Sequence, residues 1–159
     1  MMRDEFKGIT PEEYQNLTDA IAEITILIAG ADGTVHKNEV EWAEKVTKIR
    51  SYNLPKRLSS YYKDVGKNFR EKLDHWHDRF LQDPEKTNSE VKSNLAELNP
   101  IFEKLEDRRI AYELYLSFLS FARHVARSTG GFLGWGSIGP EEDEVIGLTM
   151  IEPIRPPRE

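Results

Sequence analysis

The sequence predicts an all-α fold, an irregular bundle of about six to seven helices with a pseudo-repeated helix-turn-helix. Apolar residues recur at three- and four-residue steps through most of the chain of 159 residues, which is typical of helices with one buried face. No segment combines alternating polarity with a hairpin turn signal, as paired strands would. Two glycine-containing turns, at residues 30–34 and 130–139, lie between helical patterns, and a glutamate follows each.

The first helix is expected to begin at residues 10–13, where Thr-Pro-Glu-Glu forms a capping box with proline at the first helical position. Its apolar residues share one side, whereas Asp19 and Glu23 fall on the opposite side, so we expect an amphipathic helix. This helix should end near Gly30, and a second should end before Pro55.

One continuous helix is predicted over residues 55–81, because its apolar stripe persists throughout, and we expect it to be the central packing surface. A helix over 84–98 follows, and a short helical piece holds the apolar residues of 101–105. The segment 107–128 is apolar around much of its circumference, so it should be the most buried helix. A last helix is predicted over 140–150.

We predict a single helical domain at residues 10–151, with an N-terminal arm at 1–9 and a proline-rich tail at 152–159. The absence of cysteine excludes thiolate zinc sites and a cysteine nucleophile. A net charge of -6 with scattered basic residues argues against nucleic acid as a partner. Because no apolar segment is long enough for membrane insertion and no signal peptide is recognisable, we expect a soluble, cytoplasmic protein.

The segment 31–39 resembles the second half of an EF-hand loop. Loop positions five, six, eight and twelve are matched by Asp32, Gly33, Val35 and Glu39. Carboxylates suit calcium and magnesium, because these hard ions prefer oxygen ligands. The first turn therefore has the chemistry of a divalent-cation site.

Two positions of that comparison lack a ligand, because loop positions one and three would be Ile28 and Gly30, which carry no side-chain oxygen. A self-contained EF-hand is therefore excluded. Glu142 holds the same place in the second turn as Glu39 in the first, so Asp32, Glu39 and Glu142 are the predicted metal ligands. Convergence of their carboxylates within about 5 Å of one point would permit a shared ion.

The same acidic residues also have a purely structural interpretation. Glu39 and Glu142 lie where the third residue of a helix caps its own first turn and interacts favourably with the helix dipole. Asp32 can form a local hydrogen bond in a turn. The sequence leaves both interpretations open.

The two turns resemble the signature segments of the TerB-like tellurite-resistance family. The matching segments are 27–35 followed by Glu39, and 126–134 leading to 141–142. The resemblance implies an all-helical, pseudo-symmetric fold, a divalent-metal site to which Asp32, Glu39 and Glu142 correspond, and a role in chemical stress, often within larger assemblies of proteins. The second turn departs from the family pattern, because Thr129 replaces an acidic residue and residues 131–137 lengthen the turn.

The sequence shows no spacing of a nucleophile, a base and an acid that is typical of a catalytic site, so we expect a non-enzymatic protein. Phe132 and Trp135 give an alternative function, in which the loop at 130–139 presents apolar side chains to a protein partner without any metal. His75 and His77 lie about 200° apart on a helix and cannot share one ion, so we expect them near the surface with Trp76 inward.

Overall fold

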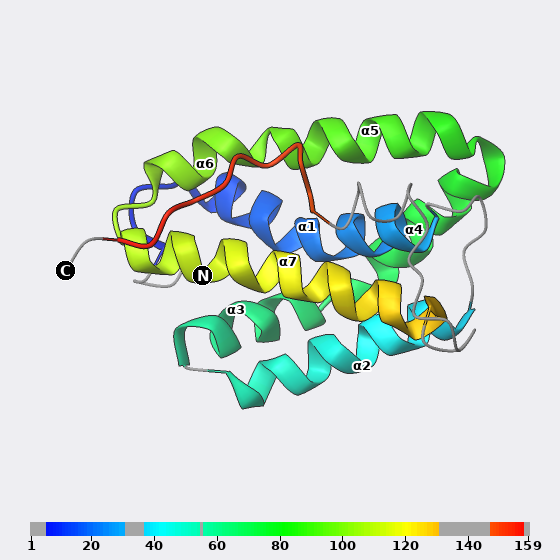
Figure 1. The fold of residues 1–159 in the computed structure, drawn as a ribbon, viewed down its shortest axis with the longest axis horizontal. Coiled ribbons are helices and arrows are strands. Elements are labelled where there is room, and N and C mark those ends of the chain that lie inside the picture. Colours follow the sequence, from blue (N-terminus) through cyan, green and yellow to red (C-terminus); the bar gives the residue numbers. More distant parts are fainter. Residues whose placement is uncertain (1–5, 31–36, 55, 131–146, 158–159) are drawn as a thin grey trace.

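The computed structural model describes residues 6–30, 37–54, 56–130 and 147–157 of the chain. Within these ranges it contains seven helices and no strand, which confirms the predicted all-α fold (Figure 1). The helices are α1 (Pro11–Ala29), α2 (Lys37–Asn53), α3 (Lys56–Gly66), α4 (Phe69–Gln82), α5 (Pro84–Ala96), α6 (Leu98–Lys104) and α7 (Arg108–Gly130). The predicted pseudo-repeat rests on turns at 31–36 and 131–146, which lie outside the described residues.

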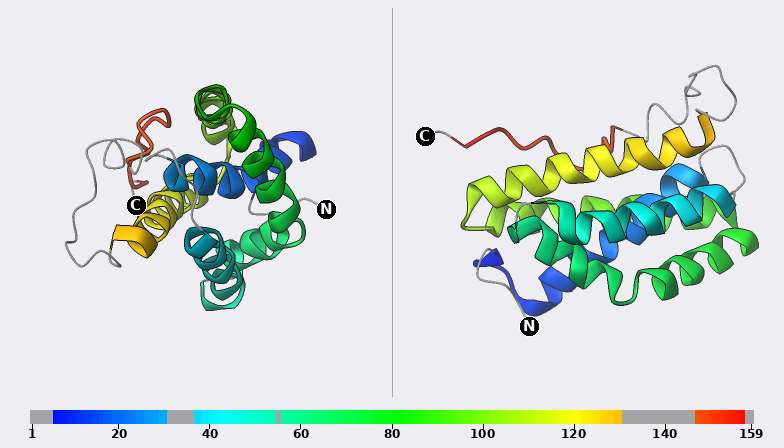
Figure 2. Two further views of the ribbon diagram at one scale, coloured as in Figure 1. Left: turned by 90° about the vertical axis from the view of Figure 1, so that its right-hand side faces the viewer. Right: turned by 90° about the horizontal axis from the view of Figure 1, so that it is seen from below.

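Helix α1 is the centre of the bundle, with the other helices arranged around it (Figures 1 and 2). It contacts every other helix, and each residue from 20 to 30 is buried. The expectation that 55–81 would be central and 107–128 the most buried is therefore wrong. Asp19 and Glu23 predicted an amphipathic α1, but Glu23 is buried on the supposed polar side. The buried Thr25 hydroxyl donates within the helix to the Ile21 carbonyl, at 2.8 Å.

The predicted long helix at 55–81 is two helices, α3 and α4, separated by a turn at Lys67 and Asn68. Gly66 ends α3, because glycine is among the residues that least favour a helix interior. Asn68 precedes α4 with a φ of -142°, outside the helical range. The apolar stripe runs through this break because both helices pack against α1.

The two ends of α1 show how local sequence fixes a helix. The predicted capping box is present: the Thr10 N–H donates to Glu13 Oε1 at 2.9 Å, and the Glu13 N–H donates to Thr10 Oγ1 at 3.1 Å. At the other end Gly30 has a φ of -87°, so its backbone does not need glycine. A Cβ at Gly30 would lie 2.5 Å from a ring carbon of Phe80, so glycine is required for the close approach of α4.

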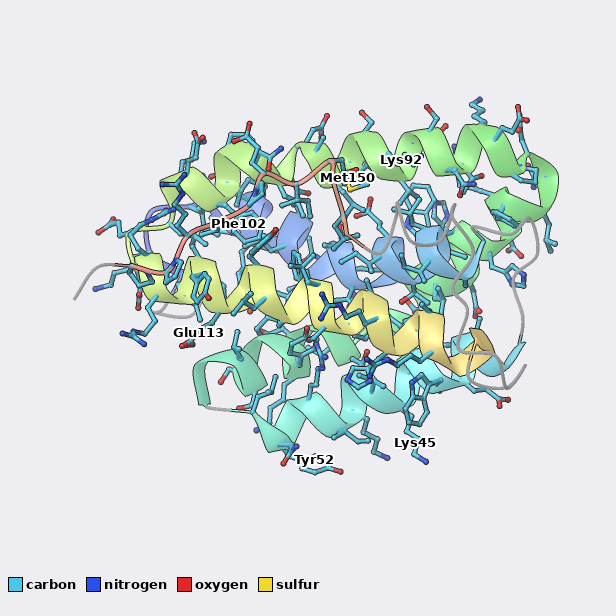
Figure 3. All side chains as sticks on the ribbon, in the orientation of Figure 1. Lys45, Tyr52, Lys92, Phe102, Glu113 and Met150 are labelled. Carbon is cyan, nitrogen blue, oxygen red and sulfur yellow. The ribbon has the colours of Figure 1, made fainter. Side chains whose placement is uncertain are left out.

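Residues 147–157 form a non-helical segment that runs over the face of the bundle between α6 and α7 (Figure 1). The predicted last helix is wrong at 147–150, where the chain turns and Leu148 has a φ of 46°, which an α-helix cannot accommodate. Leu148 and Ile151 are buried, and Met150 packs against the core between α5 and α7 (Figure 3). The rest of that predicted helix, 140–146, lies outside the described residues.

Both ends of the described chain join one hydrophobic core. Phe6, in the predicted N-terminal arm, is fully buried, and its ring meets that of Tyr14 edge-on at 5.0 Å. At the other end the Asn99 amide donates to the Met150 carbonyl at 3.0 Å and accepts from the Glu152 N–H at 2.8 Å. Residues on both sides of the helical segment therefore take part in its packing.

Candidate functional site

The predicted metal ligands cannot be located from the described residues. Asp32 and Glu142 fall in the ranges 31–36 and 131–146, outside the described residues, and Glu39 belongs to α2 but its side chain is not described. Phe132 and Trp135 of the alternative interaction loop also lie outside. The structure therefore neither brings these carboxylates together nor separates them.

The helix ends that flank the two motifs lie at the same end of the bundle (Figures 1 and 2). The last turn of α1 leads to the first motif, the first turn of α2 follows it, and the last turn of α7 leads to the second. Helix α7 packs against both α1 and α2. The described helix ends next to the two motifs therefore lie near one another.

A polar cleft of about 480 Å³ lies at the side of α1 that faces α4 and α5. Its lining includes Asp19 and Glu23 from α1, Lys72, His75 and Trp76 from α4, and Asn94 from α5. The buried residue Leu98, at the start of α6, completes an apolar part of the wall. Helices distant in sequence thus form a concave site with several polar groups.

Glu23 is the most perturbed carboxylic acid of the cleft. Its side chain is only 5% exposed, and among the described residues no group forms a hydrogen bond with Oε2. Burial raises the pKa of Glu23 from an ordinary value of 4.5 to about 7, opposed by a side-chain hydrogen bond from Asn94. The negative charges of Asp19 and Glu97 also raise the pKa, and the positive charge of Lys72 lowers it.

Asp19, one turn away from Glu23, is in contrast well satisfied. Its Oδ1 accepts from Gln15 Nε2 at 3.0 Å and forms an ion pair with Lys72 Nζ. This ion pair also engages the ammonium group of Lys72, whose side chain is 22% exposed. The cleft therefore holds one neutralised pair and a separate buried carboxylic acid.

Trp76 supplies the aromatic part of the cleft. It is partly buried against the core, as expected, and its ring meets His75 edge-on at 5.4 Å. The Arg79 guanidinium lies 5.7 Å from the Trp76 ring centre. His75 is exposed and His77 is half-buried, which agrees with the prediction that both histidines lie near the surface.

Sequence reasoning missed Glu23 because it placed this residue on a solvent-facing side of α1. The neighbouring sequence carried a signal, since residues 20–31 are apolar around most of the helix apart from Glu23 and Thr25. An acid inside such a segment is expected to be buried with it. Within the described ranges, no group of three or more histidines, aspartates or glutamates is placed to hold a metal ion.

Comparisons with models of protein families, with curated proteins and with solved structures gave no match. Among the described helices, none is sufficiently long and apolar to cross a membrane.

Proposed function

We propose that this protein is a cytoplasmic, non-enzymatic TerB-like module that binds a divalent cation and acts in stress response through contacts with other proteins. The ion, calcium or magnesium, would be held by Asp32, Glu39 and Glu142. Carboxylate oxygens from three separate positions suit these hard cations, which take most of their ligands from oxygen.

The observation that supports this proposal is the common location of the flanking helix ends (Figure 1). Asp32 follows Ala29, the last residue of α1, by three positions, and Glu39 lies in the first turn of α2. Helix α7, from which the second motif continues, packs against both of these helices. Such packing favours a site shared between the two motifs over two unrelated turns.

A metal-free interaction module is the second candidate, and the capping box at Thr10 and Glu13 favours it. There the third residue of a helix is a glutamate that accepts from the cap backbone at 2.9 Å. Glu39 and Glu142 would act in the same way, and the loop at 130–139 would contact the partner protein through Phe132 or Trp135.

Thermal unfolding of the full chain with and without calcium or magnesium distinguishes the two candidates. A ligand that binds only the folded state stabilises it, by about 2.7 kcal/mol at a concentration a hundred times its dissociation constant. The stabilisation should disappear in the triple variant Asp32→Asn, Glu39→Gln, Glu142→Gln. Glu85→Gln, which changes an exposed glutamate in the first turn of α5, is the matched control and should retain it.

Unchanged stability of the natural sequence in both ions at about 10 mM would contradict the metal proposal and leave the metal-free module. Equal stabilisation of the triple variant would show that the ion binds elsewhere.

A further inference from the structure

We propose that the cleft between α1, α4 and α5 is a second binding site, separate from the helix turns, which takes a small primary ammonium compound with a short apolar body. The positively charged head group would contact Glu23, and the apolar body would lie against Trp76 and Leu98. The proposal rests on the charge of the cleft, the state of Glu23 and the shape of its wall.

The charge of the cleft favours a cation. Its acidic lining residues are Asp19, Glu23, Glu71 and Glu97, and its basic ones are Lys72 and His75. Lys72 is paired with Asp19 and only partly offsets the charge of Glu23, so the lining keeps an excess of acidic groups. An anionic ligand would meet an excess of negative charge, whereas a cation would be attracted.

Glu23 provides the anchor for that cation. Glu23 lines the cleft, its side chain is only 5% exposed, and Oε2 has no hydrogen-bond partner among the described residues. A buried carboxylate without a full set of partners is unfavourable. An ammonium group would supply both the opposite charge and the missing hydrogen-bond donor.

The lining favours an organic cation over a metal ion. Calcium takes six to eight oxygen ligands, and no three acidic or histidine side chains of the described part are grouped to hold an ion. An ammonium group needs fewer acceptors, and Asn94 and Glu97 stand beside Glu23. Trp76 and Leu98 offer apolar surface for the rest of the ligand, and a volume near 480 Å³ suits a small molecule.

The charges around Glu23 make binding depend on pH. Asp19 faces it from α1, and Glu71, Lys72 and His75 line the cleft from α4. Asn94 lines it from α5, and Glu97 follows the end of that helix. A cation binds the ionised carboxylate, so affinity should rise as Glu23 loses its proton near pH 7.

Phenethylammonium chloride and its neutral isostere 2-phenylethanol are suitable probes for the full chain. Binding is measured by calorimetry and by the NMR shift of the Trp76 indole, which Trp76→Phe identifies, with a metal chelator present throughout. The ammonium probe should bind at least about ten-fold more tightly than the alcohol. Its affinity should increase about ten-fold from pH 6 to pH 8, the change in the ionised fraction of an acid with a pKa near 7.

Glu23→Gln should lower the ammonium affinity at least about ten-fold. Glu12→Gln, an exposed position on the same helix, removes the same charge outside the cleft and should change it less than about two-fold. Helical circular dichroism checks that both variants fold.

Equal affinity for the ammonium and the alcohol would overturn the proposal, as would undiminished binding to folded Glu23→Gln or no binding by the natural sequence at about pH 8. If Glu23→Gln does not fold, the pH dependence and the alcohol comparison on the natural sequence still decide. The chelator keeps these results independent of any metal at the helix turns.

Discussion

Glu23 and Arg50 are both buried charged residues, but their surroundings differ. Arg50 is 8% exposed, and its Nη1 donates to the Tyr62 hydroxyl at 2.9 Å and to the Ser117 carbonyl at 2.8 Å, while Nη2 donates to the Ser120 hydroxyl at 2.7 Å. Glu23 is 5% exposed and leaves Oε2 without a hydrogen bond to any described residue. The buried cation of Arg50 uses its hydrogen bonds to connect helices, whereas the buried acid Glu23 lines a cleft and has one oxygen without a partner among the described residues.

The two residues also differ in how they respond to pH. Arginine remains charged at all ordinary pH values, and the Arg50 guanidinium lies over the rings of Tyr62 and Phe121 at 5.3 and 5.5 Å. Burial, and then the charges of Arg50 and Arg127, lower the pKa of the neighbouring His124. Glu23 instead changes its own charge near pH 7, so it is the buried residue suited to a reversible role.

Replacement of Arg50 should give the largest loss of stability. Arg50→Ala should lower the free energy of unfolding by about 3 kcal/mol, because it removes the packed side-chain stem and leaves buried acceptors on α3 and α7 without their donor. Urea unfolding followed by circular dichroism measures the change. Lys48→Ala, at an exposed position of α2, is the control and should stay within about 0.5 kcal/mol. An equally small loss for Arg50→Ala would remove the distinction between the two residues.

Glu23→Gln should have the opposite sign and a strong dependence on pH. Since the folded pKa of about 7 lies above the ordinary 4.5, the folded state holds the proton more tightly. Its contribution to stability is complete below about pH 4.5 and is lost as pH rises through 7. Without the acid, the free energy of unfolding should increase by about 3 kcal/mol near pH 9 and change little near pH 4.

Urea unfolding of Glu23→Gln and the natural sequence across this pH range, without amines in the buffer, tests the prediction. A pH-independent difference between the two proteins would show that Glu23 does not titrate differently on folding.

Asn94→Ala should give the smallest effect, because Asn94 only modulates Glu23. Its side-chain hydrogen bond lowers the pKa of Glu23, so its removal should raise that pKa further while changing stability by less than about 1 kcal/mol. NMR titration of the Glu23 carboxyl carbon measures the shift. Asn16→Ala, in the same cleft but exposed, is the control. A lowered pKa in Asn94→Ala would contradict the assigned role.

Features of the fold that depend on residues close together in the sequence could be predicted from it. The capping box at residues 10–13 and the start of α5 at Pro84 follow from local hydrogen bonding and proline geometry. The break after Gly66 was missed because the apolar stripe keeps its spacing through the turn. The central place of α1 was missed because Glu23, which was expected to face solvent, is buried.

The candidate cleft could not be predicted, because it arises only when α1, α4 and α5 pack together. Glu23 and Asn94 are far apart in the sequence, and no local pattern links them. The predicted ligands Asp32, Glu39 and Glu142 came from a local motif and a resemblance, and whether their carboxylates converge stays a prediction.

Because residues from both ends of the described chain pack into one core, that core can be completed only late in synthesis. Phe6 leaves the ribosome well before Ile151, which is buried in the same core. The apolar surface of α1 would therefore stay exposed until α7 and the segment after it have emerged from the ribosome. During that interval the nascent chain is a potential client for chaperones that bind exposed apolar segments.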